Sequence, residues 1–181
     1  MLLEEHKTGR LLLRKVTPEI LEHIYGSFSE EEQMAYLGFD TKEELKKEKL
    51  KFKEGLSTHN RKFLYFKLFD PVLQNIWGWC GYHTWYTDHD RAEIGYGLFS
   101  NDLKRQGLMT EAMRFTLDYG FNNMNLHRVE AFIGSNNEAS LKLAAKFGFQ
   151  NEGVLREHYF YEGRHEDSEA FGLLKSEYKA I

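Results

Sequence analysis

The residues best suited to chemistry lie in a short basic turn in the second half of the chain. Lys104 and Arg105 supply positive charge there, and Gly107 has no Cβ, so its backbone can approach a ligand closely. A strand-like run, Glu93–Phe99, precedes the turn, and a helical pattern, Thr110–Asn123, follows it. Because the first amides of a helix attract anions, the arrangement predicts a diphosphate site. The alternative is an ordinary solvated connection.

Glu93 is the first candidate for a general base. It lies on the run that leads into the basic turn, close to Gly95 and Gly97. A carboxylate there can accept a proton directly or through water if burial raises its pKa. The alternative is an exposed strand carboxylate paired with Arg91 or another cation.

Apolar runs between turn residues predict about seven strands to position these groups. They cover residues 10–16, 62–69, 76–85, 91–99, 128–133, 152–160 and 167–174. A turn around Gly163 joins the last two runs as a hairpin, and the runs between 62 and 99 form a meander. The layout is α+β.

Four helices are expected to accompany these strands. They follow Thr17, run from Thr41 to about Leu56, cover Thr110–Asn123, and lie between Asn137 and Gly148. Side-chain oxygens of Thr17, Thr41 and Asn137 can cap the free amides of three of these helices. Residues 29–40 show no clear helical period, so we expect a loop over the substrate or a connector.

Composition indicates one domain covering residues 1–181 and argues against several functions. The net charge is −4, which argues against a general nucleic-acid binder. Apolar runs are too short for a membrane span, and the first residues are too charged for a secretory signal. Cys80 is the single cysteine, so we expect a buried thiol and a reducing compartment, the cytoplasm. His158 and His165 lack a partner set, so no metal site is predicted.

Several segments together resemble the GNAT acetyltransferases. Lys104–Met109 resembles their acetyl-CoA loop, Q/R-x-x-G-x-G/A, and the string from Gly107 to Ala112 is similar to the ribosomal-protein N-acetyltransferase (RimJ/RimL) branch. Further matches, in register, are Ala92–Tyr96, Leu126–Ala131, Asn137–Ser140, Lys146–Phe149 and Glu152–Arg156. Lys104 and Met109 depart from the usual residues. Lys keeps the charge but loses the planar fork of Arg.

The resemblance implies a fold and a co-substrate. The fold is a mostly antiparallel sheet with helices on both faces and a V-shaped opening between its central strands. The co-substrate is acetyl-CoA, with no metal. The residues implied to bind it are Leu98, Phe99, Lys104, Arg105, Gln106, Gly107, Leu108, Met109, Thr110, Asn137 and Ser140.

The resemblance also implies the chemistry, which is direct transfer of acetyl to a primary amine. Glu93 is then the base. Ala144 stands where many relatives have a tyrosine acid, so either Ser140 donates to the leaving thiolate or the thiolate is left to solvent. Helix capping alone is the alternative for Asn137 and Ser140. His83, Tyr159 and Tyr161 are candidates to line the acceptor pocket, with aromatic strand packing as the alternative for the two tyrosines.

Three questions stay open at the level of sequence. The acceptor is a protein N-terminal α-amine, perhaps ribosomal, or a small amine such as a polyamine, an amino acid or an aminoglycoside. A non-catalytic acyl-CoA sensor is a rival of another class. A third hypothesis, a plain nucleotide-binding protein, has less support, because the turn matches neither of the phosphate-loop patterns G-x-x-x-x-G-K-[ST] and G-x-G-x-x-G. A homodimer is plausible.

Overall fold

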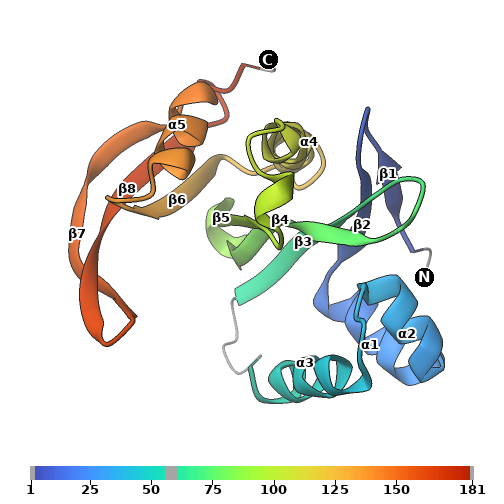
Figure 1. Ribbon diagram of the computed structural model, residues 1–181. Coiled ribbons are helices and arrows are strands. Elements are labelled where there is room, and N and C mark those ends of the chain that lie inside the picture. Colours follow the sequence, from blue (N-terminus) through green and yellow to red (C-terminus); the bar gives the residue numbers. More distant parts are fainter. Residues whose placement is uncertain (1–2, 56–60, 180–181) are drawn as a thin grey trace.

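One eight-stranded sheet carries the fold. The computed structural model describes residues 3–55 and 61–179, and Figure 1 shows how their elements are arranged. The strand order is β1-β2-β3-β4-β5-β6-β8-β7. The strands are β1 (Glu5–Lys7), β2 (Leu12–Val16), β3 (Arg61–Phe69), β4 (Ile76–Tyr86), β5 (Arg91–Leu98), β6 (Arg128–Gly134), β7 (Gln150–Tyr161) and β8 (Arg164–Leu174). The strand that the sequence pattern missed is the short β1, which pairs with β2.

Helices cover both faces of this sheet, as expected. They are α1 (Pro18–Ser27), α2 (Glu30–Leu37), α3 (Lys42–Gly55), α4 (Leu108–Asn122) and α5 (Glu138–Lys146), with short 3-10 turns η1 (Thr87–His89) and η2 (Asn101–Leu103). Helices α1, α2 and α3 lie on one side, and α4 and α5 on the other (Figure 1). No helix in the described ranges is long and apolar enough to cross a membrane.

The predicted caps start three of these helices. The Thr17 side chain accepts from the amide of Ile20, and the Asn137 side chain accepts from the amide of Ser140. Thr41 and Glu44 exchange hydrogen bonds at the start of α3, as a capping box should. Gly148, at a φ of +81°, follows the end of α5. Leu56, the expected end of α3, lies outside the described residues.

The expectation of a loop over residues 29–40 is wrong, because α2 occupies most of this segment. A capping box between Ser29 and Glu32 starts the helix, and Gly38, at a φ of +69°, ends it. The helix has eight residues, of which only Gln33, Tyr36 and Leu37 are buried. So few buried positions, one of them polar, leave no readable hydrophobic period.

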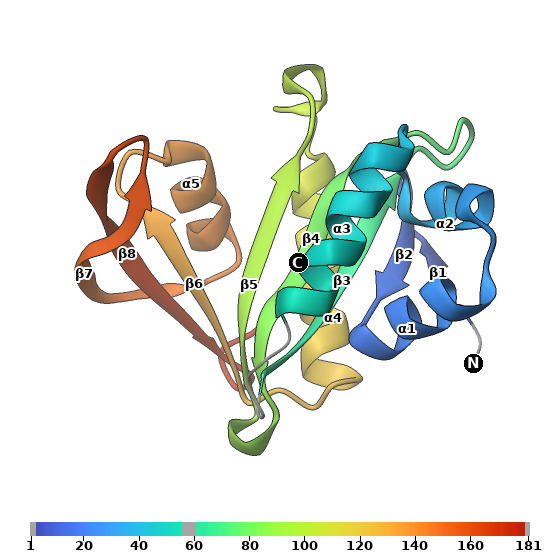
Figure 2. The ribbon, with the colours of Figure 1, turned by 90° about the horizontal axis from the view of Figure 1, so that it is seen from below.

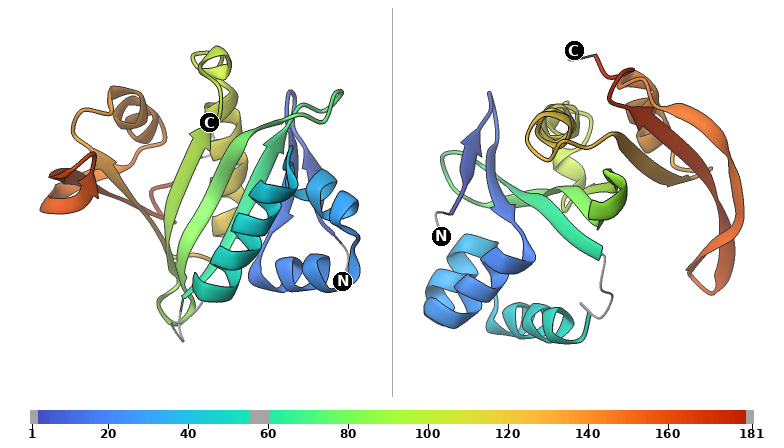
Figure 3. Two further views of the ribbon diagram at one scale, coloured as in Figure 1. Left: turned by 60° about the horizontal axis from the view of Figure 1, so that its bottom comes forward. Right: turned by 180° about the vertical axis from the view of Figure 1, so that it is seen from behind.

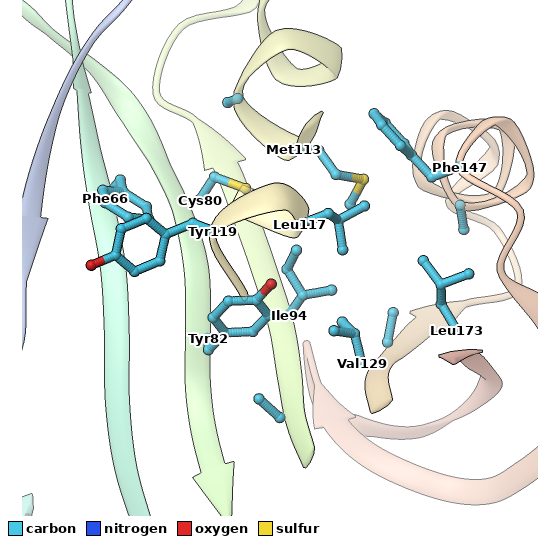
Figure 4. Close-up of a cluster of buried hydrophobic side chains, with 14 of the residues drawn as sticks. Phe66, Cys80, Tyr82, Ile94, Met113, Leu117, Tyr119, Val129, Phe147 and Leu173 are labelled. Carbon is cyan, nitrogen blue, oxygen red and sulfur yellow. The ribbon is translucent and has the colours of Figure 1, made fainter. Parts of the chain in front are cut away.

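The main core lies between the sheet and helices α4 and α5. Figure 4 shows its centre, where Tyr82, Ile94 and Leu117 pack together. Leu108, Ala112 and Tyr119 are buried along α4 and Phe115 is partly buried, which confirms the face predicted for this helix. Cys80 is fully buried in the same core, as expected, and burial raises the pKa of its thiol to about 12.

The sheet opens between β5 and β6. These strands are parallel and pair over only three positions, from Arg91–Arg128 to Glu93–Glu130. The other six pairings of the described strands are antiparallel. Beyond the third pair β5 and β6 diverge, and Figure 2 shows the V between them. The predicted V-shaped splay is confirmed, and Glu93 is the last paired residue of β5, at the point where the V opens.

A network of salt bridges links the strands at the closed end of the V. Glu130 accepts from Arg91 Nη1 at 2.6 Å and from Arg128 Nε at 2.9 Å. Arg128 also forms a bidentate pair with Glu152 of β7. Four side chains thus link β5, β6 and β7 at the end where the V is closed. The β7–β8 hairpin continues the sheet on the β6 side of the V (Figure 3).

Candidate active site

The basic turn has the geometry that the sequence predicted. It joins β5 to α4 at the open end of the V (Figure 2), and its side chains from Lys104 to Gln106 are exposed. Arg105 and Gly107 both have left-handed backbone conformations, with φ of 61° and 79°. Gly107 occupies the N-cap position of α4 without a side-chain cap. The first amides of this helix are therefore available to an anion.

The other predicted loop residues have divided roles. Leu108 is buried in the main core, so it can offer a ligand only its backbone, while Met109 and Thr110 are partly buried in the first turn of α4. Leu98 ends β5 and packs against the core, whereas Phe99 is 63% exposed at the start of the loop.

Thr8 and Arg10 of the N-terminal segment hold the loop through hydrogen bonds that the sequence pattern did not show, and we call these contacts the latch. Arg10 Nη1 donates to the carbonyl of Gln106 at 2.7 Å. The Glu111 carboxylate accepts from Arg10 Nε at 2.9 Å, from the Arg10 amide at 2.7 Å and from Thr8 Oγ1 at 2.6 Å. Burial alone would raise the pKa of Glu111, but these bonds from Thr8 and Arg10 hold it below its ordinary value. The hydrogen-bonded residues lie about 100 positions apart in the chain, so no local sequence pattern indicates that they meet.

A hollow of about 570 Å³ lies beside this latch. Its walls include Gly107 and Thr110 together with three cationic side chains, Arg10, Arg114 and Lys146. The Nε atom of Arg114 is buried and has no hydrogen-bond partner among the described residues. The carboxylates of Glu111 and Asp118 line it too, so three cationic side chains outnumber two anionic ones next to the helix start.

A second cavity, of about 200 Å³, lies in the V itself and brings together most of the predicted catalytic and acceptor-site residues. Its lining residues come from β4, β5, β6, β7 and the start of α5. They are His83, Glu93, Ile94, Gly95, Tyr96, Ala131, Phe132, Ile133, Gly134, Asn137, Ser140 and Tyr159. Five of the twelve were site candidates from sequence. Tyr96 was part of a matched motif but had no assigned role.

Glu93 meets two of the other candidates in this cavity. Its Oε1 lies 3.2 Å from His83 Nε2 and accepts from the Tyr159 hydroxyl at 3.5 Å. The Glu93 side chain is only 15% exposed. Arg91, the partner named in the alternative, instead pairs with Glu130, and Glu93 is mostly buried rather than exposed. The other part of the alternative, pairing with another cationic side chain, is compatible with the contact to His83.

A β-bulge places His83 beside this carboxylate. Tyr82 pairs with Ile94 and Thr84 pairs with Glu93, which leaves His83 as the extra residue of β4. His83 Nδ1 lies 3.2 Å from Thr84 Oγ1. Gly95 leaves room for the ring, because a Cβ on Gly95 would lie 2.5 Å from His83 Cδ2. A bulge interrupts the alternation of a strand and is not visible in a sequence pattern.

Tyr159 reaches the cavity from the edge strand. Burial, followed by the nearby Glu93 carboxylate, raises the pKa of the Tyr159 phenol. Tyr161 is not brought to Glu93: it lies at the end of the hairpin, 60% exposed. It lines a separate open hollow of about 850 Å³ with Asn137 and Arg164.

Asn137 and Ser140 cap α5 and also line the V. The Asn137 side chain accepts from the Ser140 amide at 3.2 Å, so capping is confirmed, and both residues face the cavity as well. Within the described ranges, no group of three His, Cys, Asp or Glu side chains is placed to hold a metal ion.

Comparison with known proteins gives one consistent family. The profile of the acetyltransferase (GNAT) domain matches residues 10–150. The uncharacterized N-acetyltransferase p20 of Bacillus licheniformis is 34% identical over 176 residues, which cover 94% of this chain and 96% of that protein.

Two solved structures share the fold over nearly the whole chain. The ribosomal-protein-S5-alanine acetyltransferase of Vibrio fischeri has a TM-score of 0.67 and 23% identity, covering 97% of this chain and 99% of that one. The spermidine N-acetyltransferase of Vibrio cholerae, solved in complex with CoA and spermine, has a TM-score of 0.66 and 24% identity, covering 94% and 99%.

Proposed function

The chain belongs to the GNAT acetyltransferase family, and we propose that it transfers an acetyl group from acetyl-CoA to a primary amine in the V between β5 and β6. The observation that carries this proposal is the cavity of about 200 Å³ that Glu93 and Ser140 both line. A proton acceptor and a hydroxyl donor at one opening are what acyl transfer from a thioester to an amine requires.

The chain's own residues suit acetyl-CoA. The uncapped amides at the start of α4, with Lys104 and Arg105, suit its diphosphate. The hollow beside Gly107, with its three cationic side chains, suits the phosphate on the ribose of CoA. Asn137, at the V, suits the amide groups of the pantetheine arm. The solved relative with CoA bound supports this assignment by its fold.

Glu93 is the base in this proposal. An α-amine has a pKa near 8, so most of it is protonated at neutral pH and must lose a proton before attack. Glu93 accepts that proton, directly or through a water, and the contact with His83 and Tyr159 fixes the carboxylate in place. The amine nitrogen then bonds to the thioester carbon, the carbon–sulfur bond breaks with its electron pair going to sulfur, and the Ser140 hydroxyl donates a hydrogen bond to the departing thiolate. The remaining surplus proton on the nitrogen leaves as the amide forms and neutralises the thiolate, so the products are the amide and free CoA thiol.

The acceptor we propose is a protein N-terminal α-amine, following the RimJ/RimL-like loop. The structural relatives act on either a ribosomal protein or spermidine by their names, so a small polyamine is the second candidate. The ring of Trp79 lies 6.4 Å from that of His83, and the face of an aromatic ring near the acceptor would favour a cationic amine.

We also propose a homodimer through the edge strand β7. All twelve residues of β7 are exposed, including Val154, Leu155 and Phe160. An exposed apolar edge of this length is a site for pairing with a second copy. The cytoplasmic location stays a prediction.

The test is thiol release from acetyl-CoA against a panel of N-terminal peptides and small amines. We expect release with one class of acceptor and an acetylated product by mass spectrometry. Acetyl-CoA binding without release on any acceptor would favour the sensor over the enzyme.

The Glu93→Gln variant tests the base. We expect a loss of roughly 10²- to 10⁴-fold in kcat at neutral pH, and a smaller loss at high pH, where the amine is already neutral. Glu138→Gln is the matched control, since Glu138 is exposed on α5 and contacts Lys142. An unchanged pH–rate profile in Glu93→Gln would remove Glu93 as the base.

A further inference from the structure

Tyr96 has a feature that the proposed chemistry leaves unexplained. It lies on β5 and lines the cavity in the V. Its hydroxyl oxygen is buried and has no hydrogen-bond partner among the residues that the structure describes. A buried hydroxyl without a partner costs folding free energy, so its presence in a cavity calls for an explanation.

Tyr96 and Glu93 lie on opposite faces of the sheet. Successive residues of a strand point to opposite faces. Ile94 is buried in the main core under α4, whereas Gly95 faces His83. Tyr96 therefore shares the face of Ile94 and packs against the same core, while Glu93 shares the face of His83. The open V is where groups from the two faces meet.

Ser140 is the polar group next to the Tyr96 hydroxyl. Both residues line the cavity in the V, and the Ser140 side chain partly offsets the rise that burial causes in the pKa of Tyr96. The Ser140 amide is already bonded to Asn137. In the described part of the chain, the Ser140 hydroxyl makes no hydrogen bond that would hold its orientation. Two hydroxyls in one cavity are thus left to pair with each other.

We propose that Tyr96 is a positioning residue that donates its hydrogen bond to Ser140 Oγ and so directs the Ser140 hydrogen at the departing thiolate. This inference rests on the proposed function. A serine hydroxyl has one hydrogen and two lone pairs. If Tyr96 occupies a lone pair, the remaining hydrogen is free to point into the V.

The step balances without a proton leaving Tyr96. The ammonium proton passes to Glu93, the new carbon–nitrogen bond forms, and the electron pair of the carbon–sulfur bond goes to sulfur. The second proton on the nitrogen leaves as the amide forms and neutralises the thiolate, so the products are the amide and the free thiol of CoA. Ser140 donates a hydrogen bond to that sulfur and keeps its proton, as Tyr96 does. Because burial keeps the Tyr96 phenol protonated, it remains a donor over the whole working pH range.

The test compares Tyr96→Phe, Ser140→Ala and the double variant in thiol release. Tyr96→Phe removes one oxygen and keeps the ring in the core. We expect kcat to fall about tenfold in Tyr96→Phe and by a similar or larger factor in Ser140→Ala, with the KM for acetyl-CoA changed less than about twofold. The double variant should be no slower than Ser140→Ala alone. Both changes act on the same hydrogen bond, the one from Ser140 to sulfur, so it can be lost only once.

Tyr82→Phe is the matched control. Tyr82 is also a buried strand tyrosine, but its hydroxyl donates to the Thr116 carbonyl at 2.9 Å. We expect Tyr82→Phe to lower the melting temperature and leave kcat unchanged. We expect Tyr96→Phe to lower kcat without lowering the melting temperature. This opposite pattern separates a catalytic effect from a structural one.

Three results would overturn the inference. Wild-type kcat in Tyr96→Phe would show that its hydroxyl is not used, with the proposed function left standing. Multiplicative losses in the double variant would show that Tyr96 does not act through Ser140. An absence of turnover in the wild-type protein on every acceptor would remove the proposed function and this inference with it.

Discussion

Replacing Gly107 separates the two things that the loop needs, which are backbone shape and positive potential. Gly107 has a φ of +79°, and a Cβ there would lie 3.4 Å from Arg10 Nη2, ordinary contact. The left-handed conformation costs a residue with a side chain roughly 1–2 kcal/mol. Gly107→Ala and Gly107→Glu should therefore both lose about 1–2 kcal/mol of unfolding free energy.

The two variants should differ in affinity for acetyl-CoA. The alanine leaves the amides of α4 in place, so we expect a loss of roughly tenfold or less, from the strained loop alone. The glutamate adds a negative charge where the diphosphate binds. A like charge at about 4 Å costs roughly 1–4 kcal/mol, depending on the effective dielectric constant. That is a further loss of roughly fivefold to a thousandfold in Kd.

Denaturant unfolding and calorimetric titration with acetyl-CoA measure the two effects. Gly26→Ala is the control, because Gly26 lies in the last turn of α1 and a Cβ there meets nothing within 4 Å. It should gain about 0.4–1 kcal/mol of stability and leave affinity unchanged. Equal affinity of Gly107→Glu and Gly107→Ala for acetyl-CoA would refute the placement of the diphosphate at this loop.

Two further predictions concern the framework around the site. Glu111→Gln should lower the unfolding free energy by about 1–3 kcal/mol, because the carboxylate accepts from Thr8 and Arg10. Since the folded-state pKa of Glu111 is below its ordinary value, the deficit should be full above about pH 5 and shrink as the pH falls below about 4. A pH-independent deficit in denaturant titrations would contradict this. Ser29→Ala should cost about 1 kcal/mol by thermal or urea unfolding, through loss of the α2 capping box, and no loss would contradict that cap.

Local signals in the sequence predicted much of the framework. Thr17, Thr41 and Asn137 are caps that act within three or four residues, so their positions could be predicted from neighbouring residues alone. The face of α4 followed from a helical period, although the helix begins at Leu108, two residues before the predicted Thr110. The eight-residue α2 was missed because its few buried positions carry no period.

Contacts between distant segments could not be predicted. The bond from Arg10 to the Gln106 carbonyl joins residues 96 positions apart, and no spacing rule links them. His83 was a candidate, but its place beside Glu93 depends on a bulge that shifts the register of β4. The unpartnered hydroxyl of Tyr96 is a property of packing and becomes visible only in three dimensions.

The measurement that tests the central claim most directly is titration of the wild-type protein with acetyl-CoA by calorimetry, with free CoA and ATP as competitors. The account predicts saturable binding that free CoA displaces and ATP does not, because the proposed site extends from the loop and the hollow beside it to the V, and ATP has no pantetheine arm to reach the V. No binding of acetyl-CoA, or displacement by ATP as effective as that by CoA, would contradict the assignment of this site.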